Sequence, residues 1–265
     1  MQTLLASLRA GWSRASDGNA ALIAAGIAYY GFLALVPLLA AAFLTYGLVV
    51  DPETIAAHGQ SLTQTLPGAA GELVAGQLEN VAERRGGSSG LGLAIALALA
   101  LIGARVAAGA LITALDMAFE AKAERGFIAA NLLALAITLG AVVALGLVAG
   151  ITALVSTLLA GTGGAFASYA LMGIAGFGGA TLAYRIVPQR RVVTRGQAMR
   201  GAALFAIGWI AASAGFGFYA SNFGNYDATY GSLGAVVVFL TWVWLSAWLL
   251  LLGAHFAVAY RMTNE

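Results

Sequence analysis

Long uncharged apolar stretches alternate with short polar segments along almost the whole chain. The first, 20–50, contains no charged residue over 31 positions, whereas a membrane-spanning helix needs about 20 apolar residues. The apolar region of a signal peptide is shorter, about 7–15 residues, so this stretch predicts a spanning helix. Five similar stretches follow. The pattern therefore predicts six transmembrane helices, over 20–50, 91–115, 127–160, 165–184, 201–221 and 231–260.

Two features bear on the shape and number of these helices. Pro37 lies within the first stretch, where its ring removes one backbone hydrogen bond and clashes with the preceding turn, so we expect a kink there. Segment 165–184 is rich in Gly, which lowers helix propensity. Without this segment the count falls to five, and the two termini would lie on opposite sides of the membrane.

Two amphipathic segments flank the first apolar stretch. Segment 1–18 places its large apolar side chains on one helical face, with Leu4, Leu5, Leu8 and Trp12. This pattern predicts a helix lying on the cytoplasmic leaflet, with a frayed terminus as the alternative. Segment 51–90 is the longest polar stretch, and within it 69–85 separates apolar from Glu positions. We expect a small extracytoplasmic helical region there, followed by a flexible Gly-Ser connector.

Composition supports a lipid environment. Of the 265 residues, 61% are apolar and 9% charged, whereas soluble domains carry about 25% charged residues. The 35 Gly residues suit helices that approach closely within a membrane. The absence of Cys excludes disulfides and thiolate metal sites. We therefore expect an all-α, polytopic membrane protein in which 1–265 form a single membrane domain.

The basic residues predict the orientation. Cytoplasmic segments are enriched in Lys and Arg, and with the N-terminus inside, the predicted inner segments hold ten of the 13 basic residues while the outer segments hold only Arg84 and Arg85. Both termini are therefore expected in the cytoplasm. The densest group is Arg185, Arg190, Arg191, Arg195 and Arg200. This group is a topology signal, and binding of anionic lipid headgroups, at about 1 kcal/mol per residue, stays open. It is too small and scattered for a nucleic-acid surface.

Arg105 is the one basic residue inside a predicted span. It lies 14 residues into 91–115, or about 21 Å along the helix, where a charge costs about 2.5–3.5 kcal/mol. The six spans contain no Asp or Glu, and Asp116 is about 16 Å further along. Protein carbonyls, Tyr or Asn could satisfy the guanidinium, it could snorkel inward, or it could bind an anion, with a lipid phosphate as first candidate. Asp116 or Asp227 from another segment also stays open if helices are broken.

Other polar groups in or beside the spans complete a candidate ligand site. They are Tyr29, Tyr30, Asn131, Tyr230, Gly231, Ser232 and His255. These groups could line a cavity or join interhelical hydrogen bonds. The turn at 230–232 opens the last helix and could attract an anion, although Ser232 could simply cap the helix. His255 is the only imidazole in a span, and both a proton relay and a hydrogen-bonded role stay open.

Signatures of an enzyme are missing from the sequence. Two isolated His residues and scattered acids do not supply the clustered ligands of a metal nuclease. No Gly-x-Ser-x-Gly nucleophile motif is present. We therefore expect neither an enzyme nor a bound metal or cofactor.

Several motifs nevertheless resemble one family. Residues 225–235 read Asn-Tyr-Asp-Ala-Thr-Tyr-Gly-Ser-Leu-Gly-Ala, and Trp-Val-Trp-Leu-Ser-Ala follows at 242–247. The first span contains Ala-Tyr-Tyr-Gly-Phe at 28–32, and Val187-Pro188 precedes two arginines. In this order, over about 20–260, the motifs resemble the YihY/virulence-factor BrkB family of bacterial inner-membrane proteins. The chain departs from the family pattern at Asp116, often Asn, and at His255, where a carboxylate is frequent.

The resemblance implies a six-helix inner-membrane fold and an envelope or transport role. A ribonuclease label that some members carry is rejected here on the chemical grounds above. Two functional hypotheses follow: a transporter or flippase for an anionic lipid or other amphiphilic solute, and a non-transporting scaffold that acts through 51–90. Membrane lipids are the expected partners, and homo-oligomerisation stays open.

Overall fold

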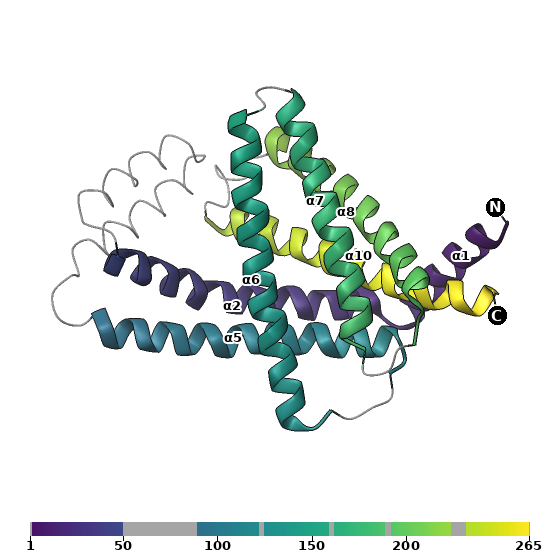
Figure 1. The fold of residues 1–265 in the computed structure, drawn as a ribbon, viewed down its shortest axis with the longest axis horizontal. Helices are drawn as coiled ribbons and strands as arrows, with labels where there is room; N and C mark the ends of the chain where they lie inside the picture. Colours follow the sequence, from purple (N-terminus) through teal and green to yellow (C-terminus); the bar gives the residue numbers. More distant parts are fainter. Residues whose placement is uncertain are drawn as a thin grey trace.

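The computed structural model describes residues 2–49, 89–121, 125–158, 162–188, 192–223 and 232–264, and within these ranges the regular structure is α-helical (Figure 1). The helices are α1 (Gln2–Asp17), α2 (Ala20–Val49), α5 (Ser89–Ala118), α6 (Phe127–Leu158), α7 (Thr162–Ile186), α8 (Arg195–Phe223) and α10 (Ser232–Asn264). The all-α expectation is confirmed, and each of the six apolar stretches is helical over its described residues. Of the predicted extracytoplasmic region 51–90, residues 51–88, including the helix 69–85, lie outside the described residues, and residues 89–90 belong to α5.

Two helices test particular sequence arguments. Helix α7 covers the Gly-rich segment 165–184 without a break, so tertiary context outweighs its low helix propensity. Helix α8 begins at Arg195, six residues before the apolar stretch. The cause is a capping box: the Thr194 backbone N–H donates to Gln197 Oε1 at 2.8 Å, and the Gln197 N–H donates to Thr194 Oγ1 at 3.3 Å. The Thr-x-x-Gln spacing in the sequence is the signal for this earlier start.

The six long helices form a closed ring of neighbours. Packing runs from α2 to α5, α6, α7, α8, α10 and back to α2, while α1 lies on α10. In Figure 1 α2, α5, α7, α8 and α10 approach one another toward the end of the molecule that holds both termini. From there α2 and α5 run side by side toward the left of the view and α7 and α8 toward its top, while α6 begins at the lower edge and crosses α5 and α2. The arrangement is therefore a set of diverging helices and not a parallel bundle.

The hydrophobic core occupies the converging end. Most of its members come from the carboxyl-terminal halves of α5, α7 and α10 and the amino-terminal parts of α2 and α8, with Ala15 of α1 and Ala134 of α6, and more than half of them are Ala. Small side chains let helix backbones approach closely. By contrast, large apolar side chains on the diverging parts are exposed, such as Leu91, Leu147 and Phe218.

The closest crossing in this core joins α8 and α10 at two glycines. A Cβ placed on Gly253 would lie 2.5 Å from Tyr184 Oη and 2.6 Å from the Gly201 carbonyl oxygen. Tyr184, from the end of α7, is 1% exposed and donates a hydrogen bond to the Leu250 carbonyl at 2.5 Å. Its ring packs edge-to-face on Phe119, which follows α5. Tyr184 therefore connects α7, α10 and the residue that follows α5. It lies beside a helix crossing that only glycine permits.

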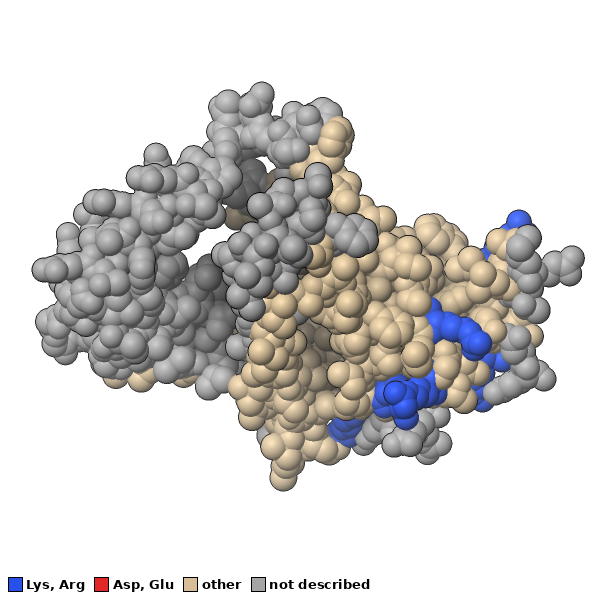
Figure 2. All heavy atoms as spheres, turned by 45° about the horizontal axis from the view of Figure 1, so that its top comes forward, with Lys and Arg blue, Asp and Glu red and all other residues tan. Residues whose placement is uncertain are grey.

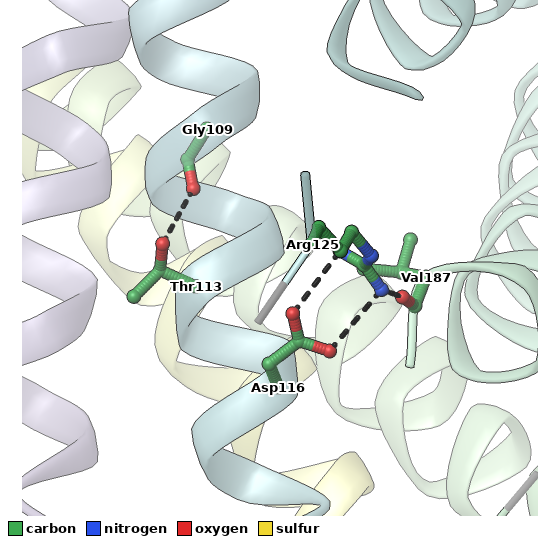
Figure 3. Close-up of polar contacts among 5 residues, drawn as sticks. All are labelled: Gly109, Thr113, Asp116, Arg125 and Val187. Atoms are coloured by element: carbon green, nitrogen blue, oxygen red, sulfur yellow. Dashed lines mark hydrogen bonds and ion pairs between the residues drawn. The ribbon is translucent and has the colours of Figure 1, made fainter. Parts of the chain in front are cut away.

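A partly buried ion pair closes the same end from the other side (Figure 3). Arg125, just before α6, pairs with Asp116 on α5 at 3.1 Å and donates to the Val187 carbonyl that follows α7. The side chains are only 10% and 19% exposed. A cation at a helix C-terminus is favoured by the helix dipole, so Arg125 caps α7 while it binds α5.

Helix α1 is attached through small residues and one exposed ion pair. Ser7, Gly11 and Ala15 form its buried face, and a Cβ on Gly11 would lie 2.9 Å from Phe256 Cα on α10. Arg14 pairs at 2.5 Å with Glu120, which has a positive φ of 52° in the turn after α5. That conformation is normally taken by Gly at a helix C-terminus.

Length and composition single out two segments with described side chains as able to cross a membrane. They are Arg195–Phe218 and Val236–Thr263, and in the apolar 18-residue stretch of each, 22% and 17% of the residues are buried. Core helices of soluble proteins are mostly buried, so these low values favour an apolar surrounding. Shorter apolar helical segments are Ala20–Ala34 and Ile128–Gly140.

We expect Gly253→Ala to destabilise the protein by about 1–3 kcal/mol, because the added methyl meets backbone and a buried phenol that cannot move aside. Gly26→Ala is the matched control, since nothing lies within 4 Å of its Cβ position. Ala favours helix over Gly, so the control should be neutral or stabilising. Thermal unfolding in detergent measures both, and equal midpoints would contradict the proposed crossing.

The two ion pairs should differ in strength. Asp116→Ala leaves Arg125 buried without its carboxylate, and we expect a loss of about 3 kcal/mol. Glu120→Ala removes a partner that is 59% exposed, so the loss should stay below about 1 kcal/mol. Chemical unfolding of both variants in one detergent provides the comparison, and a larger effect of Glu120→Ala would refute this ranking.

Candidate functional site

Arg105 and Asn131, singled out separately in the sequence, meet in the structure. Arg105 lies on α5 with an exposed side chain, and its Nε–H donates a hydrogen bond to Oδ1 of Asn131 on α6. Two turns further along α6, Thr138 Oγ1 donates to the Ala134 carbonyl at 2.9 Å and approaches the Ala104 carbonyl at 3.5 Å. Polar side chains of α6 therefore contact α5 at two positions, Asn131 and Thr138.

The geometry suits the guanidinium for recognition of an oxyanion. A guanidinium has five N–H donors in a rigid plane, and Asn131 engages the Nε–H. Because the Asn oxygen is neutral, this bond orients the side chain without cancelling its charge. Phosphate and carboxylate groups bind such a plane through two parallel hydrogen bonds. Of the partners left open by the sequence, an Asn from the next helix is thus one that the structure supplies.

The tyrosines proposed for the same site lie on the neighbouring helix of the ring. Tyr29 and Tyr30 on α2 contact each other edge-to-face, with ring centroids 5.5 Å apart, and both are exposed. Helix α2 packs along α5. The neighbouring helices α2, α5 and α6 therefore carry the Tyr, Arg and Asn side chains of the predicted site, respectively.

Two other predicted features are described only in part. Ser232 is the first residue of α10, while Tyr230 and Gly231 lie outside the described residues. Pro37 lies within α2, which stays helical from Ala20 to Val49. The kink at Pro37 and the anion site at 230–232 stay predictions.

His255 lies at the converging end, against the turn between α1 and α2. A Cβ on Gly18 would lie 3.6 Å from its Nε2, and the side chain is 7% exposed. Its Nδ1 is buried without a hydrogen-bond partner among the described residues. The Arg14–Glu120 pair is close enough to act on it electrostatically. The sequence around His255 contains no titratable neighbours. In the structure, α1 and the turn after α5 provide them as Arg14 and Glu120.

The arginines predicted as a topology signal gather near the converging end. Figure 2 shows basic side chains together toward the end that holds the termini, and the described atoms of this face show no acidic ones. Arg200 stacks over Tyr260 at 4.4 Å, and Arg261 donates to the Val192 carbonyl at 2.8 Å. Arg185 is partly exposed and Arg195 exposed. Arg190 and Arg191 lie outside the described residues.

The sequence analysis did not predict the two ion pairs at the converging end. Glu120 and Arg14 are 106 residues apart, and Arg125 reaches a carbonyl 62 residues away. Nothing local in the sequence links such residues. Within the described part of the chain, no three His, Cys, Asp or Glu side chains are grouped in a way that could hold a metal.

Curated proteins match the chain over limited segments. The ribonuclease-like protein YfkH of Bacillus subtilis strain 168 is 44% identical over 72 residues, which is 27% of this chain and 26% of that protein. A UPF0761 membrane protein of Alkalilimnicola ehrlichii is 43% identical over 79 residues, 30% of this chain and 18% of that protein. Another, of Tolumonas auensis, is 39% identical over 80 residues, 30% of this chain and 26% of that protein. The matched segments thus span about a quarter or less of these relatives.

No solved structure matches the chain. A family model covers it far more completely than the individual relatives do, because the match runs over residues 12–265. This range includes every motif on which the resemblance rested. The chain therefore belongs to the virulence factor BrkB family, whose relatives above include UPF0761 membrane proteins.

Proposed function

We propose that this protein is a six-span inner-membrane protein that moves an anionic lipid or similar amphiphile, with Arg105 as the contact for the anionic group. The observation that carries this proposal is the Arg105–Asn131 hydrogen bond between α5 and α6. It holds a basic side chain, which remains exposed, in the middle of an apolar helix.

The lengths of the helices support six spans. The helices of the ring have between 25 and 33 residues, or about 38–50 Å at 1.5 Å per residue. The hydrocarbon core is about 30 Å thick, so each helix is long enough even when tilted. Tilting also accommodates the divergence seen in Figure 1. The arginine-rich converging end then faces the cytoplasm, as the positive-inside rule requires.

The position of Arg105 along α5 supports a depth near the centre of the bilayer. The Asp116–Arg125 pair belongs at the cytoplasmic boundary, because charged groups avoid hydrocarbon. Arg105 lies eleven residues before Asp116, about 16 Å along the axis, and half the hydrocarbon thickness is about 15 Å. A charge at that depth requires a polar or ionic environment.

An anionic ligand fits this environment better than a neutral one. Asn131 holds the exposed Arg105 side chain by its Nε–H. A phosphate can form two parallel, charge-assisted hydrogen bonds with the plane of a guanidinium. Arg105 would then bind the anionic headgroup of a lipid midway across the membrane, while the acyl chains of that lipid stay in the bilayer.

Topology is directly testable because the chain has no Cys. We expect a single Cys at position 75 to react with a membrane-impermeant maleimide added to intact spheroplasts. A Cys at the exposed Thr194 should react only after the inner membrane is opened. Labelling of both positions from the same side would refute the proposed orientation.

Transport should depend on the charge and geometry at Arg105. In proteoliposomes, we expect Arg105→Ala to slow the transfer of fluorescent phosphatidylglycerol at least tenfold. Asn131→Asp should also slow it, because the new carboxylate neutralises the guanidinium in place. Arg195→Ala is the control, since this exposed arginine lies at the start of α8.

Dithionite bleaching of the outer leaflet measures the transfer. Wild-type activity that persists in Arg105→Ala would remove this residue from the mechanism. If correctly inserted wild-type protein moves no anionic amphiphile, the transport proposal fails and the scaffold hypothesis for 51–90 becomes the better one.

A further inference from the structure

A hollow of about 380 Å³ lies where α1, the start of α2 and α10 meet, away from the Arg105–Asn131 site. This volume is within the range of small-molecule sites, about 300–1,000 Å³. The lining combines two indole rings with small and polar side chains: Trp12, Trp248, Ala15, Ala20, Ser16, Asn19, Ala21 and Leu22. It could hold part of an amphiphile but not a whole phospholipid.

The hollow is a product of the way α1 docks. Because α1 meets α10 through small residues, its bulky side chains remain on the outside. Trp12 packs edge-to-face on Trp248 of α10, with centroids 5.5 Å apart. Trp244 Nε1 donates to the Ala21 carbonyl at 2.9 Å and fixes the start of α2. The walls are therefore set by helix packing.

The surface beside the hollow is apolar with one basic residue. Leu5 and Trp12 are 55% and 56% exposed, and Leu22 on the α2 wall is 73% exposed. Positions 5, 9, 12 and 16 share one face of a helix because they are spaced by three or four residues. Arg9, also exposed, therefore lies on the same face of α1 as Trp12 and Ser16.

We propose that this hollow is a binding site for an anionic phospholipid of the cytoplasmic leaflet. The phosphate would meet Ser16 and Asn19, with Arg9 about two helical turns from Ser16 supplying positive charge beside the hollow, and the first methylenes of the acyl chains would lie against Trp12, Trp248 and Leu22. Indole rings favour the headgroup level of a bilayer, where one edge is wet and the rest is apolar. This inference rests on the membrane placement proposed above, but not on transport.

The neighbouring acidic groups leave this charge pattern intact. Asp17 accepts a hydrogen bond from Ser13 at 3.2 Å, and positions 13 and 17 lie on the next strip of the helix surface. Glu120 is engaged with Arg14. Arg9 therefore gives the exposed face of α1 that borders the hollow its positive charge.

The test is lipid binding by the full chain in detergent micelles, followed by native mass spectrometry. The probes are phosphatidylglycerol and phosphatidylcholine with identical acyl chains. We expect one phosphatidylglycerol to bind at least about fivefold more tightly than phosphatidylcholine, as one Arg at a membrane surface would give. Arg9→Glu should erase this preference. Ser16→Trp should abolish the site by filling the hollow, and Arg9→Lys, which keeps the positive charge, is the matched control.

Four results would overturn the proposal: equal losses in Arg9→Glu and Arg9→Lys, unchanged binding in Ser16→Trp, equal affinity for both lipids, or a dimer that forms through α1 and blocks lipid. Arg9→Glu keeps the test valid if Ser16→Trp fails to fold, because position 9 is exposed. Arg105→Ala removes the lipid contact proposed for transport, and the binding that Ser16→Trp abolishes should persist in it, so failure of the transport proposal is recognised separately.

Discussion

The structure depends on the close approach of α8 and α10 at Gly201 and Gly253. No side chain separates the two backbones there, and the Tyr184 hydroxyl fills the space beside them by bonding to the Leu250 carbonyl. This contact brings the end of α7 into the same junction. Since a lipid surrounding offers little hydrophobic force between helices, dispersion contacts and hydrogen bonds of this kind determine which helices meet. The Ala-rich core around the crossing follows the same rule.

The charged side chains described above differ in their partners and in their position along the helices. Arg125 is neutralised by Asp116 and caps α7 with its second contact, as expected of a guanidinium that has left water. Arg14 and Glu120 form a more exposed pair that ties α1 to the end of α5. Arg105 instead bonds to the neutral oxygen of Asn131. Among the described contacts, these two ion pairs lie at the converging end, and the Arg105–Asn131 hydrogen bond lies further along α5.

The sequence was a good guide to the helices and a poor one to their contacts. Uncharged stretches set by hydrocarbon thickness predicted where the six long helices lie, and the Gly-rich α7 showed that composition within a stretch matters less than its apolar character. The start of α8 required reading Thr194 and Gln197 as a capping box. By contrast, Arg105 and Asn131 share a site only because α5 and α6 turn back on each other after residue 118. Likewise, no local pattern links Glu120 to Arg14, or Trp12 to Trp248.

The position of α10 in the ring has a consequence for biosynthesis. Helix α10 packs against α1, α2, α5 and α8, and it contributes the surface on which α1 docks. Since chains are made and inserted from the N-terminus, α1 and the amino-terminal half of α2 must wait without their final neighbours until α10 has been synthesised. The ring can close only at that point. A truncation in α10 would therefore leave the first helices without a docking surface, although they were synthesised correctly, and such a chain is a natural substrate for membrane quality control.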